Sequence, residues 1–205
     1  MTGRMYSDFL IFISENPRLH VWEMDLVEGR KGGSVLLTLF SRPTKLMLIF
    51  LLPDKTQLSV IRALDSLEEQ CGLGLFNSVF QIILTDNGSE FMDYLDIERS
   101  AFNESKRTWL FYCDPYSPYQ KPGIEKNHEF IRYVLPKGSN FDELSWYDVL
   151  TLASHINSVA RDSLDGLCPI KAFLRDYDLP LLDHVYLDHV QPSEVNLTPG
   201  LLKDR

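Results

Sequence analysis

The chain has 205 residues, of which 44% are hydrophobic and 24% charged, and its formal net charge is −9. This composition is typical of a globular domain with its own core, and it excludes a membrane-spanning chain because no apolar run approaches the ~20 residues of a transmembrane helix. The acidic balance argues against a nucleic-acid partner, since phosphate binding normally needs a basic surface, although bound divalent cations would reverse the sign of an acidic site.

Three strands in succession are predicted in the first quarter of the chain. Apolar and acidic side chains interleave at residues 21–27, and residues 34–41 and 45–52 are rich in Val, Leu, Ile and Phe. Short links join the three segments, which indicates an antiparallel meander. Before them, the apolar residues 9–13 predict one helical turn packed on the core.

The hydrophobic period then changes to that of a helix. Apolar side chains recur on one helical face at Val60, Leu64, Leu67 and Cys71. Asp54 or Thr56 is expected to cap the start of this helix and Gly72 to end it.

Two further strands are predicted in the middle of the chain. Residues 80–84 form a short apolar run, the mark of a strand buried on both faces, and a turn sequence follows at residues 85–88. Residues 93–107 are polar and are expected to be irregular. Residues 109–113 predict the last strand.

Two helices and an arm complete the expected order of elements. The first helix runs from Pro122 or Gly123 to Leu135, and the second spans residues 145–160. The chain after Pro180 is expected to be an extended arm. The order predicts an α/β fold with a mixed five-stranded sheet, a three-strand meander plus parallel strands, flanked by helices. The expected division is an N-terminal extension (1–18), a core domain (19–178) and a C-terminal arm (179–205).

Two aspartates are placed where open α/β sheets bind ligands. Asp86 follows a buried strand and Asp25 lies within the first strand, so the two are neighbours if these strands are adjacent and parallel. A carboxylate on the helix at 122–135 would complete a cluster. Carboxylates without cysteine or histidine ligands suit Mg²⁺ or Mn²⁺, and two such ions about 4 Å apart can stabilise both oxygens of a phosphoryl displacement.

The spacing alone leaves the identity of the acids open. Glu23 shares a strand face with Asp25, and Glu129 shares a helix face with Glu125. A lone aspartate at a strand end is also more often a turn residue than a functional one.

Several segments resemble a known family. Residues 85–91 (TDNGSEF) resemble the T-D-N-G-x-E-F signature of retroviral-type integrase cores. Residues 114–128 (DPYSPYQKPGIEKNH) and 135–138 (LPKG) resemble the segment around the third acid, and residues 22–29 (WEMDLVEG) resemble the first-acid strand. Together they resemble the DDE transposases of insertion-sequence family thirty over about residues 20–175.

The resemblance implies an RNase H-like fold and DNA transposition. It implies Asp25, Asp86 and Glu125 as catalytic residues and as ligands of two divalent cations, Mg²⁺ or Mn²⁺. The reaction would be phosphodiester cleavage at transposon ends followed by strand transfer into target DNA. The resemblance also implies a homo-oligomer when active, and a bacterial cytoplasmic protein that associates with the nucleoid.

Two departures from the family are visible. Pro122 stands where such proteins usually have glycine, which is tolerable in the first turn of a helix. The N-terminal helix-turn-helix module that recognises terminal repeats in relatives is not found, so sequence-specific DNA recognition is expected to lie elsewhere.

Side chains around the third acid are candidate DNA contacts. Lys121, Lys126 and Arg132 are expected to contact the DNA backbone, or else to form a solvated face. His128 is expected to contact a phosphate or orient a ligand, or else to be an ordinary exposed histidine of the helix. Two alternatives to a transposase remain at this stage: a metal-dependent nuclease on the same fold, and a catalytically silent relic that only binds DNA or its own copies.

Overall fold

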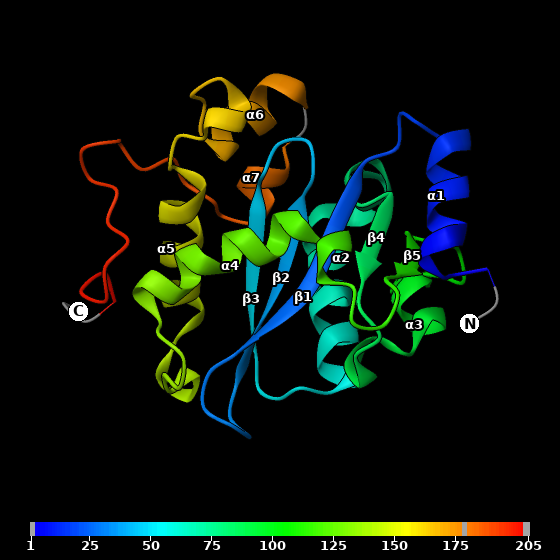
Figure 1. The fold of residues 1–205 in the computed structure, drawn as a ribbon, viewed down its shortest axis with the longest axis horizontal. Coiled ribbons are helices and arrows are strands. Elements are labelled where there is room, and N and C mark those ends of the chain that lie inside the picture. The colour runs from blue at the N-terminus through cyan, green and yellow to red at the C-terminus, as the bar shows by residue number, and fades with distance from the viewer. Residues whose placement is uncertain (1–2, 178–179, 203–205) are drawn as a thin grey trace.

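A five-stranded sheet forms the centre of the molecule (Figure 1). The computed structural model describes residues 3–177 and 180–202. The strand order is β3-β2-β1-β4-β5, with antiparallel pairing in the meander and parallel pairing of β1 with β4 and of β4 with β5. The strands are β1 (Val21–Glu28), β2 (Val35–Ser41), β3 (Met47–Leu52), β4 (Ile82–Thr85) and β5 (Trp109–Tyr112). The predicted mixed sheet is therefore confirmed.

Strands β2 and β4, on either side of β1, are buried along their whole length. Every residue of β2 and of β4 is buried, which explains why both are continuous apolar runs rather than alternating ones. Strand β1 differs because it carries acids on one face. Its register places Asp25 opposite Thr38 of β2, and Glu23 opposite Phe40 of β2 and beside Leu84 of β4.

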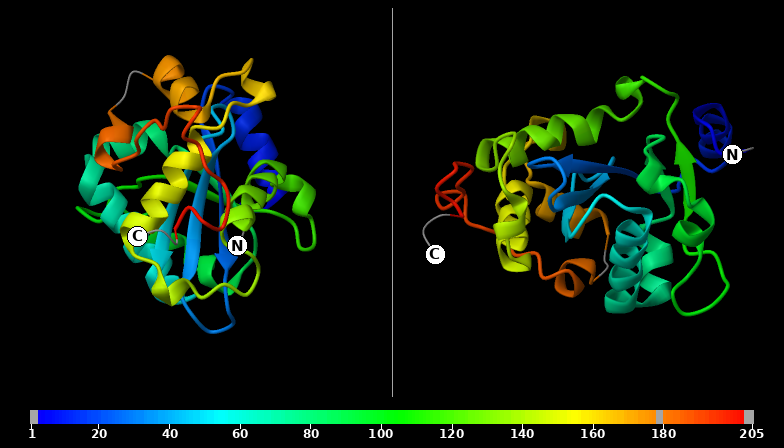
Figure 2. Two further views of the ribbon diagram at one scale, coloured as in Figure 1. Left: turned by 90° about the vertical axis from the view of Figure 1, so that its left-hand side faces the viewer. Right: turned by 90° about the horizontal axis from the view of Figure 1, so that it is seen from below.

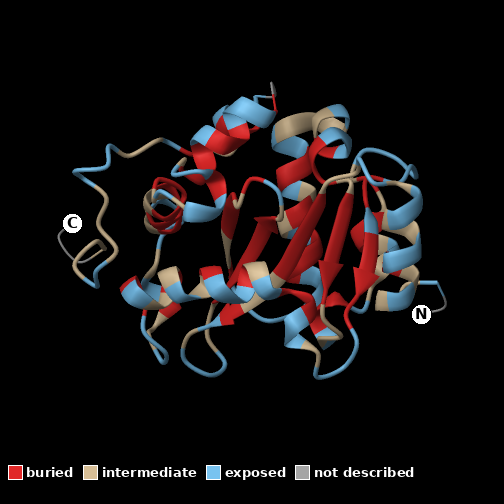
Figure 3. Ribbon diagram, turned by 45° about the horizontal axis from the view of Figure 1, so that its top comes forward, coloured by how far each residue is buried: buried red, intermediate tan, exposed pale blue. Residues whose placement is uncertain are grey.

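Helices cover both faces of the sheet. Figure 2 shows α1 (Tyr6–Glu15) and α4 (Pro122–Val134) on one face and α2 (Gln57–Val79) on the other. Helix α5 (Trp146–Asn157) packs along β3, and α3 (Tyr94–Glu98) packs on β5. Figure 3 shows that the strands and the inward helix faces are buried while the outer helix faces are exposed.

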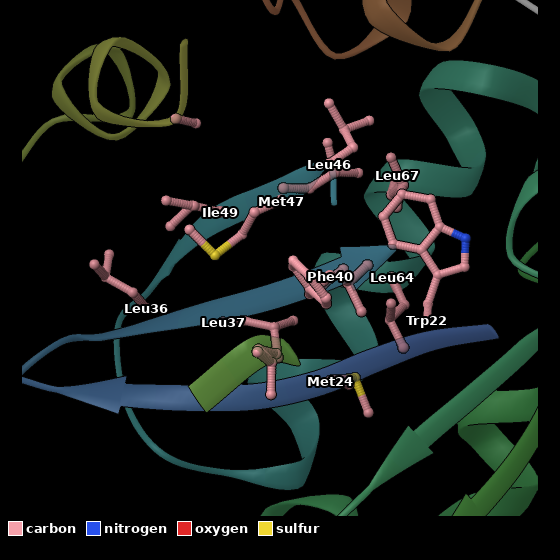
Figure 4. Close-up of a cluster of buried hydrophobic side chains, with 14 of the residues drawn as sticks. Trp22, Met24, Leu36, Leu37, Phe40, Leu46, Met47, Ile49, Leu64 and Leu67 are labelled. Carbon is pink, nitrogen blue, oxygen red and sulfur yellow. The ribbon is translucent and has the colours of Figure 1, made fainter. Parts of the chain in front are cut away.

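The main core lies between the sheet and α2. Figure 4 shows buried side chains of the strands and of α2, and Trp22, Leu64 and Leu67 are among those that fill this side of the sheet. The Trp22 indole N–H donates to the Val79 carbonyl at 2.9 Å. The Trp22 ring lies 4.7 Å from that of Phe80, a distance typical of favourable aromatic pairs. These contacts fix the end of α2 against the start of β1.

Several helices differ from the sequence expectation. The N-terminal helix α1 spans ten residues rather than one turn. The helix is interrupted at Gly72 as expected, because φ is 77° and ψ is 152° there, but a further helical segment that was not expected continues from this kink to Val79. Helix α3 lies in the stretch expected to be irregular, and α6 (Pro169–Asp176) was not predicted. Short 3₁₀ segments complete the chain at η1 (Ser89–Phe91), η2 (Pro118–Gln120), η3 (Phe141–Glu143) and η4 (Asp162–Leu164).

The C-terminal segment begins with the short helix α7 (Leu181–His184). Leu181, Leu182 and Leu187 join the core, and the chain beyond them is mostly exposed or half-buried (Figure 3). The expected boundary between 178 and 179 lies outside the described residues, so the division into extension, core and arm stays a prediction. Within residues 3–177 and 180–202, no helix has the length and apolar character needed to cross a membrane.

Candidate active site

The three candidate acids come from three elements. Asp25 lies within β1, Asp86 directly follows β4, and Glu125 lies in the first turn of α4. The predicted parallel pairing of β1 with β4 is present, and it brings the two aspartates together in the interior of the sheet, at the carboxyl end of β4.

The two aspartates share one positive charge. The Lys121 ammonium nitrogen lies 3.3 Å from Asp25 Oδ2 and 3.5 Å from Asp86 Oδ2. It also donates to the Met24 carbonyl at 3.1 Å. The lysine side chain is only 4% exposed. Two carboxylates from neighbouring strands therefore converge on a single buried cation.

The remaining carboxylate oxygens are held by backbone amides. Asp25 Oδ1 accepts from Leu26 N at 2.8 Å, and Asp86 Oδ1 accepts from Gly88 N at 2.8 Å. Each aspartate therefore has one oxygen anchored and the other aimed at the Lys121 ammonium. Both side chains remain partly open to solvent, at 20% for Asp25 and 47% for Asp86.

Glu125 is exposed, but its carboxyl interacts electrostatically with Asp25 and Lys121. Partial burial raises the pKa of its carboxyl, the charge of Asp25 raises it further, and Lys121 opposes the shift. Among residues 3–177 and 180–202, no group of three or more His, Cys, Asp or Glu side chains is arranged to hold a metal ion. The fold thus pairs Asp25 with Asp86 and leaves Glu125 at the rim.

The donor set nevertheless fits a hard divalent cation. The ligands are carboxylate oxygens, as Mg²⁺ and Mn²⁺ prefer. The ammonium of Lys121 shows that two of these oxygens already converge on one positive charge.

Glu23 lies on the same face of β1 but has structural partners. Its carboxylate is 1% exposed, accepts from Arg42 Nε at 2.8 Å and accepts from the backbone N of Ile124 at 2.7 Å. Arg42 in turn donates to the Gln120 carbonyl at 2.7 Å. Because Ile124 lies in the first turn of α4, Glu23 caps the helix that carries Glu125. The geometry therefore favours Asp25 over Glu23 as the ligand.

The start of α4 packs tightly on β2. Helix α4 begins at Pro122, in the first-turn position where proline was expected to be tolerated. A Cβ on Gly123 would lie 2.3 Å from Phe40 Cε1, so only glycine allows this approach. The sequence alone did not reveal this requirement, because Phe40 and Gly123 are far apart in the chain.

His128 supports the backbone of β1. Its Nε2 lies 2.9 Å from Thr38 Oγ1, and the Thr38 hydroxyl donates to the Asp25 carbonyl at 3.0 Å. Burial lowers the pKa of His128 to about 4, with Lys121 and Arg132 acting in the same direction and Asp25 opposing them. The His128 imidazole is thus connected to the backbone of Asp25 through the Thr38 hydroxyl.

The four candidate DNA contacts have different surroundings. Lys126 is exposed on α4, Arg132 is half-buried and donates to the Glu28 carbonyl at 2.8 Å, and Lys121 and His128 face inward. Burial lowers the pKa of Arg132. Lys126 thus presents its charge most directly to solvent.

A stiff aromatic loop precedes α4. Gln120 closes it by accepting from Asp114 N at 2.7 Å and by donating to Asp114 Oδ2 at 2.8 Å. Tyr116 is fully exposed and Tyr119 is 74% exposed. Both rings therefore face solvent in the loop that precedes α4.

The chain is similar to two groups of known proteins. No protein-family model matches the chain. The sequence resembles insertion-sequence transposases. It is 29% identical over 148 residues to the transposase InsI for insertion sequence element IS30C of Escherichia coli K12, covering 72% of this chain and 36% of that protein. It is 24% identical over 150 residues to the transposase for IS1086 of Cupriavidus metallidurans, covering 73% of this chain and 42% of that protein. The chain spans less than half the length of these curated relatives.

A solved structure with the same architecture is the catalytic core domain of BIV integrase. The match has a TM-score of 0.53 at 18% identity, and it covers 77% of this chain and 95% of the integrase core. The chain therefore has the fold of integrase catalytic cores, which is the predicted RNase H-like fold.

Proposed function

We propose that the chain is the catalytic core of a DNA transposase that cleaves phosphodiester bonds at transposon ends and joins the freed ends to target DNA. The observation that carries the proposal is that the carboxylates of Asp25 and Asp86 converge on the buried ammonium of Lys121, with Glu125 on the helix that follows. The similarity to insertion-sequence transposases and the integrase-core fold support it.

Two divalent cations, Mg²⁺ or Mn²⁺, would be held by Asp25, Asp86 and Glu125. When bound, such cations lower the pKa of water and stabilise the attacking and leaving oxygens of an in-line displacement. The three carboxylates supply the hard oxygen ligands that this chemistry needs.

The other residues of the site hold the acids in place. The backbone amides of Leu26 and Gly88 fix one oxygen of each aspartate. Glu23 fixes the start of α4 and so limits where Glu125 can lie. Such support matters because ligand groups displaced by about 1 Å lose much of their effect.

DNA would approach the face that carries α4 and the loop before it. Lys126 would contact the backbone of transposon-end or target DNA as an exposed cation, and Arg132 would do so at the edge of the same helix. The exposed rings of Tyr116 and Tyr119 would stack on bases. His128 would act by positioning Asp25, and the active form would be a homo-oligomer.

The test of the site is a crystal of the chain soaked in Mn²⁺, with the ions located by anomalous scattering. We expect one or two peaks bounded by Asp25, Asp86 and Glu125, and their loss in Asp25→Asn. Absence of any peak between Asp25 and Asp86 would contradict the proposal.

The reaction class is tested by the products formed on labelled duplex DNA. Joined strands, lost in Glu125→Gln, are expected of a transposase, whereas nicks without joining would indicate a nuclease on the same fold.

A further inference from the structure

The Lys121 ammonium is fully partnered in the structure. It donates hydrogen bonds to Met24 O at 3.1 Å and to Asp86 Oδ2 at 3.5 Å, and it forms an ion pair with Asp25 Oδ2 at 3.3 Å. Its side chain is buried almost completely. The two aspartates therefore define a position for a cation, and the ammonium of Lys121 occupies it.

A metal ion and this ammonium cannot hold that position together. A divalent cation bound to both aspartates would lie about 2 Å from their oxygens, in the space that the lysine nitrogen now borders. The two positive charges would also repel each other strongly in a partly buried site. Binding of the metal therefore requires the lysine side chain to move.

We propose that Lys121 is a built-in counter-ion, which occupies the cation position in the metal-free protein and is displaced when a divalent cation binds. The inference rests on the proposed function, since that function supplies the divalent cation. In the metal-free state the lysine offsets the repulsion between Asp25 and Asp86. Once displaced, its ammonium stays tethered one helical turn before Glu125, where it can meet a DNA phosphate.

A purely structural lysine would behave differently. If Lys121 only stabilised the fold, its loss would weaken the site and would not improve metal binding. A counter-ion that competes with the metal has the opposite effect on affinity, because its removal leaves two unpaired carboxylates facing one position.

The experiment compares the wild-type chain with Lys121→Met, which keeps an unbranched side chain of similar length and removes the charge. Mn²⁺ affinity is measured by electron paramagnetic resonance of the free ion, and Tm is measured with and without Mn²⁺. We expect Lys121→Met to bind Mn²⁺ about tenfold more tightly, equivalent to about 1.4 kcal/mol. We also expect a lower Tm without metal and a larger rise in Tm on adding Mn²⁺.

The matched control is Lys171→Met, which removes the same charge from an exposed position of α6 and should bind Mn²⁺ much as the wild type does. If folded Lys121→Met binds Mn²⁺ no more tightly than the wild type does, Lys121 is not a counter-ion that competes with the metal. The proposed function survives that result if adding Asp25→Asn abolishes Mn²⁺ binding in both the wild type and Lys121→Met. Absence of Mn²⁺ binding in every protein overturns both. If Lys121→Met does not fold, Lys121→Gln and Lys121→Arg make the same comparison, with tighter binding expected for glutamine than for arginine.

Discussion

Glu23 and Asp25 lie two residues apart on one face of β1, but their carboxylates have different partners. Both oxygens of Glu23 are taken, one by Arg42 and one by the amide of Ile124, whereas Asp25 keeps an oxygen facing Lys121. A buried carboxylate with two fixed partners stabilises the fold, and a carboxylate with a displaceable partner can bind a ligand. The distinction is set by the neighbours of each residue rather than by its type.

Replacement of Glu23 by glutamine should destabilise the protein by about 3 kcal/mol, because Arg42 loses its charge partner and one amide donor faces another at Ile124. Urea unfolding measures the change. Glu129→Gln, at an exposed position of α4, is the control and should stay within about 0.5 kcal/mol of wild type. If Glu23→Gln were as stable as that control, the contacts of Glu23 with Arg42 and Ile124 would contribute little to the free energy of unfolding.

His128 gives a pH dependence whose sign is fixed by its burial. Its pKa is about 4 in the folded chain against an ordinary value of 6.5, so between these values the unfolded chain binds more protons than the folded one. Stability should therefore fall as the pH falls through this window, by about 2 kcal/mol at pH 5 from this residue alone. Urea unfolding at pH 7 and pH 5 measures the loss.

The comparison variant is His128→Gln, which should lose less stability than wild type between the two pH values. An equal loss in both proteins would assign the pH dependence to other groups. The measurement is made without metal, since the charges of Asp25 and Lys121 both act on this imidazole.

At the scale of elements, the kink in α2 depends on one glycine. Gly72 has φ of 77° and ψ of 152°, a conformation that is strained for any residue with a Cβ. Gly72→Ala should therefore destabilise the protein by about 2 kcal/mol. Gly74→Ala, two residues on and exposed, should instead stabilise it by up to about 1 kcal/mol, since alanine favours a helix. Both are measured by urea unfolding, and stabilisation by Gly72→Ala would mean that the helix can straighten.

Local patterns predicted most of the elements. The apolar runs of the five strands are each bounded by turn residues, and the structure contains all five in the expected order. Thr56 caps α2 through Ser59 N, one of the two caps expected, and Ser145 and Asp148 form a capping box at the start of α5, where the second helix was expected to begin. Caps and periods are local features, so the sequence carries them directly.

Long-range packing explains what the sequence did not show. Helix α2 continues past Gly72 because Phe76 and Val79 bury against the sheet, and this burial depends on distant strands. Helix α6 is too short to show a clear period. The inward position of Lys121 depends on Met24, 97 residues away, so a lysine expected at the surface is buried instead.

At the scale of the whole molecule, the net charge of −9 opposes DNA binding. The opposition would be reduced if the charge of the acidic site changed from negative to positive. Divalent cations held by Asp25, Asp86 and Glu125 would make that change locally and would release the Lys121 ammonium toward the same surface. The acidic charge and a DNA substrate would then be compatible, because binding of DNA would be coupled to binding of metal. Such coupling would distinguish the chain from a DNA-binding domain with a permanent basic surface.

Mg²⁺ should therefore strengthen DNA binding by this chain at constant ionic strength. For a DNA-binding protein without a metal site, added Mg²⁺ weakens binding by competing for phosphates. Fluorescence anisotropy of a labelled duplex measures the affinity for the wild type and for the double variant Asp25→Asn/Asp86→Asn. We expect the variant to bind DNA more tightly than wild type without Mg²⁺ and to lose the response to Mg²⁺. If Mg²⁺ weakens binding equally in both proteins, DNA binds away from these aspartates.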